Sequence, residues 1–198
     1  MPILLQEPTK ENRDRAPLSD ARLVKQCLAG SDAAWAMLID KYKNLIFSIP
    51  IKYGFSRDEA SDIFQAVCLE MLSGLSNLRK PAALPKWIMQ VTSHKCLHRR
   101  REQQRTISES ESEYAEPAVN SRTEEILSEA EDEQNVRHVI SEMPPRCRQL
   151  IHMLFFEEPA RPYQDVAETL GIATGSIGFI RQRCLGRLRK RLVELGLS

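Results

Sequence analysis

The segment TGSIGFIRQRCLGRLRKRL, residues 174–192, carries chemistry suited to an anionic polymer. Six of its nineteen residues are Arg or Lys, and three are glycine. A glycine in a helix interior costs about 1 kcal/mol relative to alanine, so three in one helical segment need an explanation. Arg guanidinium groups pair with guanine edges and with phosphates, and the Gln amide pairs with adenine. These residue types therefore favour contacts with a nucleic acid.

An ideal helix, with about 100° per residue, gives this segment two different faces. One face is apolar and contains Ile177, Ile180, Cys184, Leu188 and Leu192. The opposite face contains Gly175, Phe179, Gln182, Arg183, Gly186 and Lys190. Glycines on that face let an external surface approach the backbone, and the major groove of DNA, about 12 Å wide, is such a surface. We therefore predict a helix that lies against DNA; the alternative is a solvated basic helix whose glycines have no role.

The residues just before this segment predict the rest of a helix-turn-helix. Tyr163–Leu170 has the spacing of a short amphipathic helix, and Gly171 can adopt the left-handed backbone that ends it. Ile172 is then placed to fill the angle between the two helices, and the second helix begins near Thr174.

The predicted DNA contacts divide into two groups. Side chains on the outward face of the N-terminal half of such a helix reach base edges. This position is held by Ser176, Phe179, Gln182 and Arg183. Phosphate contacts, which position the module without reading sequence, are predicted for Arg161, Arg187 and Lys190. Arg181 projects from the apolar side of the helix and is not among the predicted contacts.

The whole chain is predicted to be all-α, because helical spacing recurs along it and strand patterns are absent. SRDE, residues 56–59, fits a capping box that opens a helix, and Pro85 suits the first turn of another. Residues 77–85 are predicted to form a loop between these helices. The expected organisation is an extension at 1–17, a helical domain at 18–102, a flexible acidic linker at 103–122 and a second helical domain at 123–198.

The net charge of +1 conceals a strong segregation of charge. Six basic residues between Lys86 and Arg105 accompany only Glu102, whereas ten carboxylates between Glu109 and Glu133 accompany only Arg122. From Arg161 onward the chain is basic again. Two positive surfaces separated by a negative connector are the pattern that a function for this protein has to explain.

In its motifs and their order the chain resembles the alternative sigma factors of bacterial RNA polymerase, of the extracytoplasmic-function (group 4) type. GSDAAWAMLIDKY (30–42) resembles the opening of the family's first domain, and DEASDIFQAVCLEML (58–72) resembles its core-binding helix. YQDVAETLGIATGSIGFIRQRCLGRLRKRL (163–192) resembles the helix-turn-helix of the family's fourth region, which binds the minus-thirty-five element. The resemblance implies a promoter-specificity subunit of the polymerase, with no catalysis and no cofactor of its own.

The resemblance also implies partners and further site residues. Core polymerase would be bound through the clamp coiled coil of its largest subunit and through its flap, with Asp62, Gln65 and Leu72 at the first of these contacts. Ala66 stands where the family usually has Glu, so one charged contact is missing. Other implied partners are promoter DNA and an anti-sigma factor, with no small-molecule substrate and no membrane insertion.

Residues 77–101 correspond to the part of the family that engages and melts the minus-ten element. The residues implied there are Asn77, Arg79, Lys80, Lys86, Trp87, Arg99, Arg100 and Arg101. A flipped base needs stacking and cationic contacts to offset a cost of a few kcal/mol, and Trp87 is the aromatic candidate. A core position is an equally good interpretation of Trp87.

Other functions are less consistent with the sequence. Phosphate-binding and metalloprotease motifs are absent, and His94, Cys96 and His98 do not share one helical face, so neither an enzyme nor a metal site is expected. The five scattered cysteines predict buried free thiols in a reducing compartment, and MPILLQEP is too short for a signal peptide, so a cytoplasmic location is expected. A helix-turn-helix regulator that binds duplex DNA without being a polymerase subunit stays open as an alternative.

Overall fold

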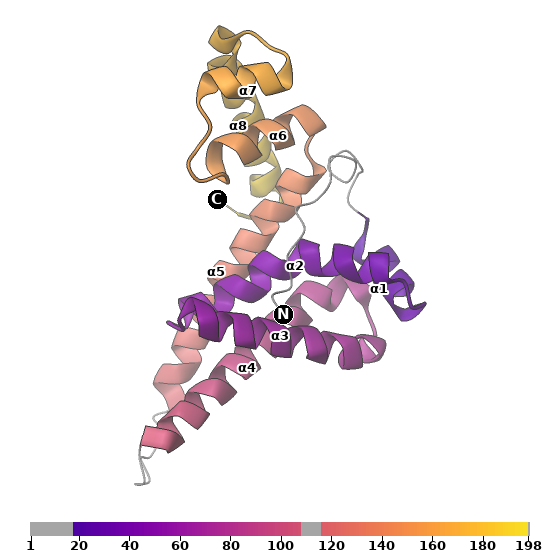
Figure 1. Cartoon of the computed structure of the whole chain (residues 1–198), viewed down its shortest axis with the longest axis vertical. Coiled ribbons are helices and arrows are strands. Elements are labelled where there is room, and N and C mark those ends of the chain that lie inside the picture. The colour runs from indigo at the N-terminus through magenta and orange to yellow at the C-terminus, as the bar shows by residue number, and fades with distance from the viewer. Residues whose placement is uncertain (1–17, 108–115, 198) are drawn as a thin grey trace. The chain divides into compact units, whose positions relative to one another are not determined.

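The computed structural model describes residues 18–107 and 116–197 (Figure 1). The predicted N-terminal extension and the middle of the predicted linker lie outside the described residues. The described part contains eight α-helices and short 3-10 turns, with no strand, which confirms the all-α prediction. It divides into two compact bodies, an N-terminal body of Leu18–Gln134 and a C-terminal body that begins at Asn135.

Four helices form most of the N-terminal body: α1 (Asp20–Leu28), α2 (Asp32–Lys52), α3 (Arg57–Gly74) and α4 (Leu84–Ile107). Apolar residues at three- and four-residue spacing, among them Leu38, Ile46 and Val67, are fully buried between these helices. Ser56 caps α3 in the predicted capping box, since its hydroxyl accepts from the Glu59 backbone N–H while the Glu59 carboxylate accepts from that of Ser56.

The helical bounds around the predicted linker differ from those expected. Helix α4 continues to Ile107, and α5 runs from Glu116 to Glu142, so both ends of the 103–122 interval are helical. The first part of α5 packs on the N-terminal body through Ile126 and Ala130, which are buried in the same core as α1 to α4. Its acidic side also has a partner there, because Lys52 on α2 pairs with Glu129 at 2.7 Å and with Glu133 at 3.0 Å.

The C-terminal body contains the end of α5, α6 (Pro145–Phe155), α7 (Tyr163–Leu170) and α8 (Ile177–Glu194). Leu150, Ile151, Val166 and Ile177 are fully or almost fully buried in its core. The boundaries of α7 are those predicted from the sequence. A short 3-10 turn at Thr174–Ser176 precedes α8.

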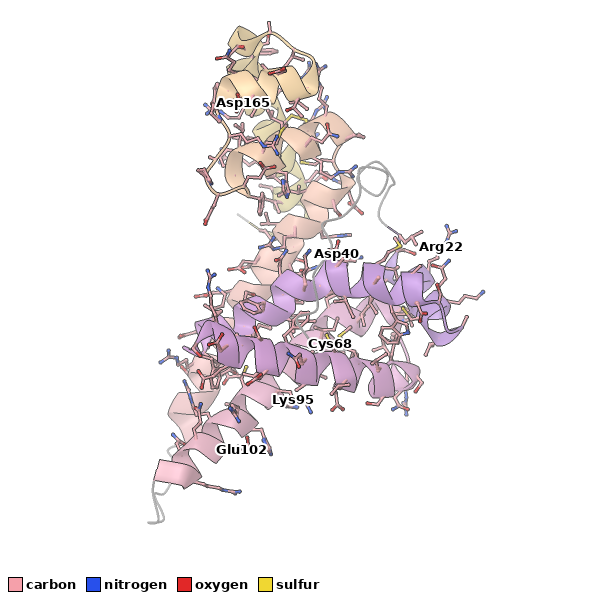
Figure 2. All side chains as sticks on the ribbon, in the orientation of Figure 1. Arg22, Asp40, Cys68, Lys95, Glu102 and Asp165 are labelled. Carbon is pink, nitrogen blue, oxygen red and sulfur yellow. A yellow bond between two sulfur atoms is a disulfide. The ribbon has the colours of Figure 1, made fainter. Side chains whose placement is uncertain are left out.

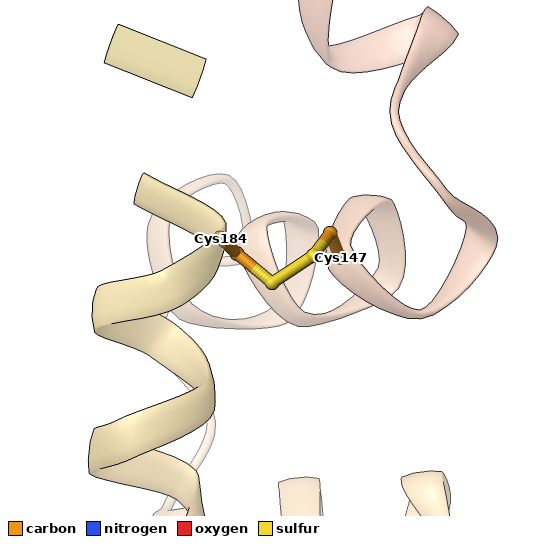
Figure 3. Close-up of a disulfide and its surroundings, with 2 residues drawn as sticks. All are labelled: Cys147 and Cys184. Carbon is orange, nitrogen blue, oxygen red and sulfur yellow. A yellow bond between two sulfur atoms is a disulfide. The ribbon is translucent and has the colours of Figure 1, made fainter. Parts of the chain in front are cut away.

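The cysteines correct one prediction. Cys27, Cys68 and Cys96 are free, with Cys68 lying on α3 (Figure 2), as expected for buried or half-buried thiols. Cys147 and Cys184 are instead joined by a disulfide between α6 and α8 (Figure 3). The prediction of five free thiols was wrong because 37 residues separate this pair in the sequence, and only packing of α6 against α8 brings the sulfurs together.

Candidate nucleic-acid interface

Helices α7 and α8 are held at their turn by the residues that the sequence singled out. Gly171 has φ 62° and ψ 44°, the left-handed conformation that favours glycine, and its N–H bonds to the Glu168 carbonyl. Ile172 packs on the C-terminal core beside Leu170, and its N–H bonds to the Ala167 carbonyl at 2.9 Å. These contacts confirm the predicted helix-turn-helix geometry.

One face of α8 is fixed in the core and the other is open. Ile177 and Cys184 are buried, and Ile180 and Leu188 pack partly buried against the same core. The exposed face carries the predicted DNA-contacting side chains of Phe179, Gln182, Arg183, Arg187 and Lys190. Phe179 is 70% exposed, so its ring is available for contact with another molecule. Ser176, at the N-cap of α8, is half-buried.

The three glycines of this segment have no role inside the C-terminal body. A Cβ added to Gly175, Gly178 or Gly186 would meet no atom within 4 Å, and none of these glycines has a positive φ. Alanine would fit each position and favour the helix by about 1 kcal/mol. Packing inside the body therefore does not require glycine here, which is consistent with close approach of another molecule to the helix.

Arg161 and Arg181 are engaged with neighbouring side chains. The Arg161 guanidinium forms an ion pair with Glu157 in the loop before α7. Arg181 donates to the Tyr163 hydroxyl, and its guanidinium lies 5.8 Å from the centre of the Tyr163 ring, so it joins α8 to α7. Arg181 was not among the predicted DNA contacts, and its bond to Tyr163 on α7 is consistent with that prediction.

The three consecutive arginines near the end of α4 are not equivalent. Arg99 and Arg101 are exposed, and Arg99 lies 3.9 Å from a Glu102 oxygen. Arg100 is half-buried and donates to the Tyr53 carbonyl at 2.7 Å, with its guanidinium over the Tyr53 and Phe55 rings. The structure thus separates Arg100 from its neighbours, because a helix turns each successive side chain by about 100°.

The loop before α4 presents its polar side chains to solvent. Two 3-10 turns, Leu75–Asn77 and Pro81–Ala83, shape this loop, and buried Leu75 and Leu84 hold its ends. The predicted contact residues Asn77, Arg79, Lys80 and Lys86 are all exposed.

Trp87 follows this loop but packs against the core. Its ring carbon lies only 2.9 Å from the position that a Cβ on Gly74 would take, and the side chain is half-buried. This close packing supports the core interpretation that the sequence left open.

Helix α3 carries a second exposed surface. Asp62, Gln65 and Leu72 are all exposed, and Leu69 joins them at the same helical spacing. Leu69 is 67% and Leu72 57% exposed, although leucines are usually buried. Leu69 was not among the residues predicted from the sequence, although its spacing of four residues from Gln65 and three from Leu72 would have indicated it. We call Asp62, Gln65, Leu69 and Leu72 the α3 stripe.

Comparison with known families gives both bodies an identity. The Sigma-70 region 2 profile matches residues 38–106, and the Sigma-70 region 4 profile matches residues 139–190. Together the two matches cover more than half of the chain. The chain belongs to the sigma-70 family. It is an RNA polymerase sigma factor that acts in transcription initiation.

A characterised relative agrees with this identity. The chain is 22% identical over 168 residues to the RNA polymerase sigma-H factor of Pseudomonas aeruginosa, across 80% of this chain and 86% of that protein. In this sigma factor, region 2 spans α2 to α4, including the α3 stripe, and region 4 includes α6, α7 and most of α8.

In this sigma factor, His94, Cys96 and His98 on α4 do not form a metal site. His94 and His98 are exposed, whereas Cys96 is fully buried and its burial raises the pKa of its thiol to about 12. Across residues 18–107 and 116–197, no group of three or more His, Cys, Asp or Glu side chains is arranged to hold a metal ion. Over the same described ranges, no helix is long and apolar enough to span a membrane.

Proposed function

We propose that this sigma factor is of the extracytoplasmic-function type, with region 2 engaging the minus-ten element and region 4 the minus-thirty-five element. The interval between the region 2 match, which ends at residue 106, and the region 4 match, which begins at residue 139, supports this type. In that interval, residues 116–138 belong to the single helix α5, and the interval is too short for a further helical domain.

The exposed face of α8 is the observation that carries the proposed reading of the minus-thirty-five element. Gln182 and Arg183 are exposed on the N-terminal half of a helix whose opposite face is buried. In this position they read base edges in the major groove, while Phe179 contacts a thymine methyl group. Arg187 and Lys190, further along α8, hold phosphates, and Arg161 joins them when it leaves Glu157.

Region 2 is proposed to bind the minus-ten element through the loop before α4 and the exposed basic side of α4. The proposed residues are Asn77, Arg79, Lys80, Lys86, Arg99 and Arg101, all of them exposed. Arg100 is assigned a supporting role, because its guanidinium is already held by the Tyr53 carbonyl and two aromatic rings. Trp87 supports the loop from inside rather than stacking on a base.

The α3 stripe is proposed to dock on core polymerase, at the clamp coiled coil of the largest subunit, as the family resemblance implies. Two exposed leucines, preceded along the helix by Asp62 and Gln65, combine apolar contact area with polar groups, as protein interfaces do. Region 4 is proposed to contact the flap. We further propose a cytoplasmic site of action, an anti-sigma factor as regulator, and no catalytic activity of its own.

Run-off transcription tests the proposal. Core polymerase with the wild-type protein is given fragmented genomic DNA, and the 5′ ends of the transcripts are sequenced to define the promoters. Arg183→Ala should alter or abolish promoter choice through the minus-thirty-five element while leaving core binding unchanged. Arg181→Ala removes the same charge from the same helix at a position bound to Tyr163, and its promoter choice should match that of the wild type. Equal promoter choice by Arg183→Ala and wild type contradicts the assignment.

A further inference from the structure

The disulfide between Cys147 and Cys184 holds the DNA-reading helix against its neighbour (Figure 3). Cys147 lies in the first turn of α6 and Cys184 in the middle of α8, with 5.4 Å between their Cα atoms. Cys184 is 1% exposed and belongs to the face of α8 opposite Phe179. The bond therefore fixes α8 to the core without occupying its exposed face.

The two cysteines differ from the other three in their surroundings. Cys147 (6% exposed) and Cys184 (1%) are as buried as Cys27 (4%) and Cys96 (0%), so burial does not separate them. Among the described residues, only Cys147 and Cys184 are close enough to form a bond, while Cys27, Cys68 and Cys96 are free. Cys147 lies near the N-terminus of α6 between Arg146 and Arg148, and both a helix N-terminus and neighbouring cations favour a thiolate. Cys147 is thus suited to react first, with Cys184 in bonding distance to complete the bond.

We propose that Cys147 and Cys184 form a reversible thiol–disulfide switch that controls the stability of the C-terminal body and, through it, binding of the minus-thirty-five element. The inference rests on the proposed cytoplasmic site of action, because disulfides in that compartment are usually transient and redox-sensing rather than structural. The oxidised form is the one competent to bind DNA.

The proposed oxidant is hydrogen peroxide, and the reaction balances. The Cys147 thiolate attacks one peroxide oxygen, the O–O bond breaks, and a sulfenic acid and hydroxide form. The Cys184 thiol then attacks the Cys147 sulfur, the S–O bond breaks, and the thiol proton leaves with the departing hydroxide as water. Two electrons pass from the two thiols to peroxide. A dithiol reverses the reaction by exchange and is itself oxidised to a disulfide.

The bond should matter for stability because the C-terminal body is small and its described core contains no aromatic side chain. Linking residues 37 apart restricts the unfolded chain strongly. Backbone amides of α6 and α8 exchange their hydrogens when these helices open. Formation of the Cys147–Cys184 bond is expected to slow this exchange by about 100-fold or more. Because apparent affinity scales with the folded fraction, DNA binding by the reduced form should be about halved at the temperature where half of this body is unfolded.

The test compares the full-length protein after treatment with hydrogen peroxide and after treatment with dithiothreitol. Peptide mapping identifies the bonded cysteines, hydrogen–deuterium exchange measures protection of α6 and α8, and holoenzyme binding to promoter fragments is measured over a range of temperatures. Oxidation should yield the Cys147–Cys184 bond and protect α6 and α8, while peptides from α2 and α3 show no change. Reduction should weaken promoter binding increasingly as the temperature rises.

Two variants make the result specific. Cys147→Ala with Cys184→Ala should lose the redox response in both exchange and DNA binding, and Cys68→Ala, a change at a free thiol, should retain it. The comparison of oxidised and reduced wild type needs no variant, so a poorly folded double variant does not remove the test. The switch is disproved if peroxide forms no such bond, or if the bond forms without changing exchange in α6 and α8. If oxidation changes hydrogen exchange in α6 and α8 but leaves promoter binding unchanged, the proposed effect on DNA binding is overturned. The exchange measurement does not depend on the proposed promoter contacts, so it tests the switch even if those contacts are wrong.

Discussion

Arg100 donates a hydrogen bond of 2.7 Å to the backbone carbonyl of Tyr53, and this contact ties α4 to the end of α2. The Tyr53 hydroxyl in turn lies 2.8 Å from the Ser93 hydroxyl and donates to Thr123 on α5. One residue of the basic RRR run is therefore part of the framework of region 2, although its neighbours face solvent. The arrangement separates the structural Arg100 from Arg99 and Arg101, the two proposed DNA contacts, in a way that mutation can measure.

Arg100→Ala should lower the free energy of unfolding of the N-terminal body by about 2 kcal/mol, since a hydrogen bond to a charged group and packing over two rings are lost. Urea denaturation followed by tryptophan fluorescence reports this body alone, because the chain has two tryptophans, Trp35 and Trp87, and both lie in it. Arg101→Ala is the matched control and should change stability by less than about 0.5 kcal/mol. A larger loss for Arg101→Ala than for Arg100→Ala contradicts the assignment.

Gly186→Ala should stabilise α8 and weaken DNA binding at the same time. The added methyl group meets no atom of the C-terminal body, so the helix gains about 0.5–1 kcal/mol. On the DNA-facing side the same methyl group should raise the dissociation constant of the holoenzyme for promoter DNA about tenfold, equivalent to about 1.4 kcal/mol. Hydrogen exchange of α8 measures the first effect and promoter binding the second.

Gly178→Ala is the control for this pair of effects, because Gly178 lies at the border of the buried face and its Cβ also meets open space. It should give a similar gain in helix stability with a smaller loss of binding. Unchanged promoter binding by Gly186→Ala is the outcome that contradicts close approach of DNA to α8.

Leu69→Ser with Leu72→Ser should weaken binding to core polymerase about tenfold or more, because the two exposed apolar side chains of the α3 stripe are lost. Stability should change little, since both side chains are already exposed to water. The binding of labelled protein to core enzyme, titrated by fluorescence anisotropy, measures the effect. Leu28→Ser changes an exposed leucine on α1 (53% exposed) and should bind core enzyme as the wild type does.

Glu59→Gln should reveal that the capping box of α3 contributes to stability in a pH-dependent way. Hydrogen bonds from the Ser56 backbone N–H and hydroxyl, and then from Gln103, lower the pKa of Glu59 in the folded protein. A group whose pKa is lower when folded stabilises the protein above its unfolded pKa, which is about 4.3 for Glu, and loses this contribution as pH falls through the folded value. Wild type should therefore be more stable than Glu59→Gln at pH 7. The difference should shrink below about pH 4.3, as measured by urea denaturation at each pH; a difference that does not depend on pH contradicts the role of the charge.

Local features of the sequence determined much of this protein. The left-handed Gly171, the Ser56–Glu59 capping box and the bounds of α7 each depend on interactions within one or two helical turns, so residue type and spacing suffice to predict them. The apolar face of α8 follows from the same periodicity. The basic outward face of residues 174–192 likewise predicted contact with nucleic acid without knowledge of the fold.

Tertiary structure alone decided which side chains meet across helices. Arg99, Arg100 and Arg101 are identical in type, and only the position of Tyr53 on the end of α2 selects the middle one for a structural contact. The sulfurs of Cys147 and Cys184 come from segments 37 residues apart, so their pairing depends on how α6 packs against α8. The acidic segment of α5 around residues 126–133 packs on the N-terminal body, because Ile126 and Ala130 are buried in its core and Lys52 pairs with Glu129 and Glu133. Contacts of this kind depend on distances between helices, which the spacing of residues along a single helix does not contain.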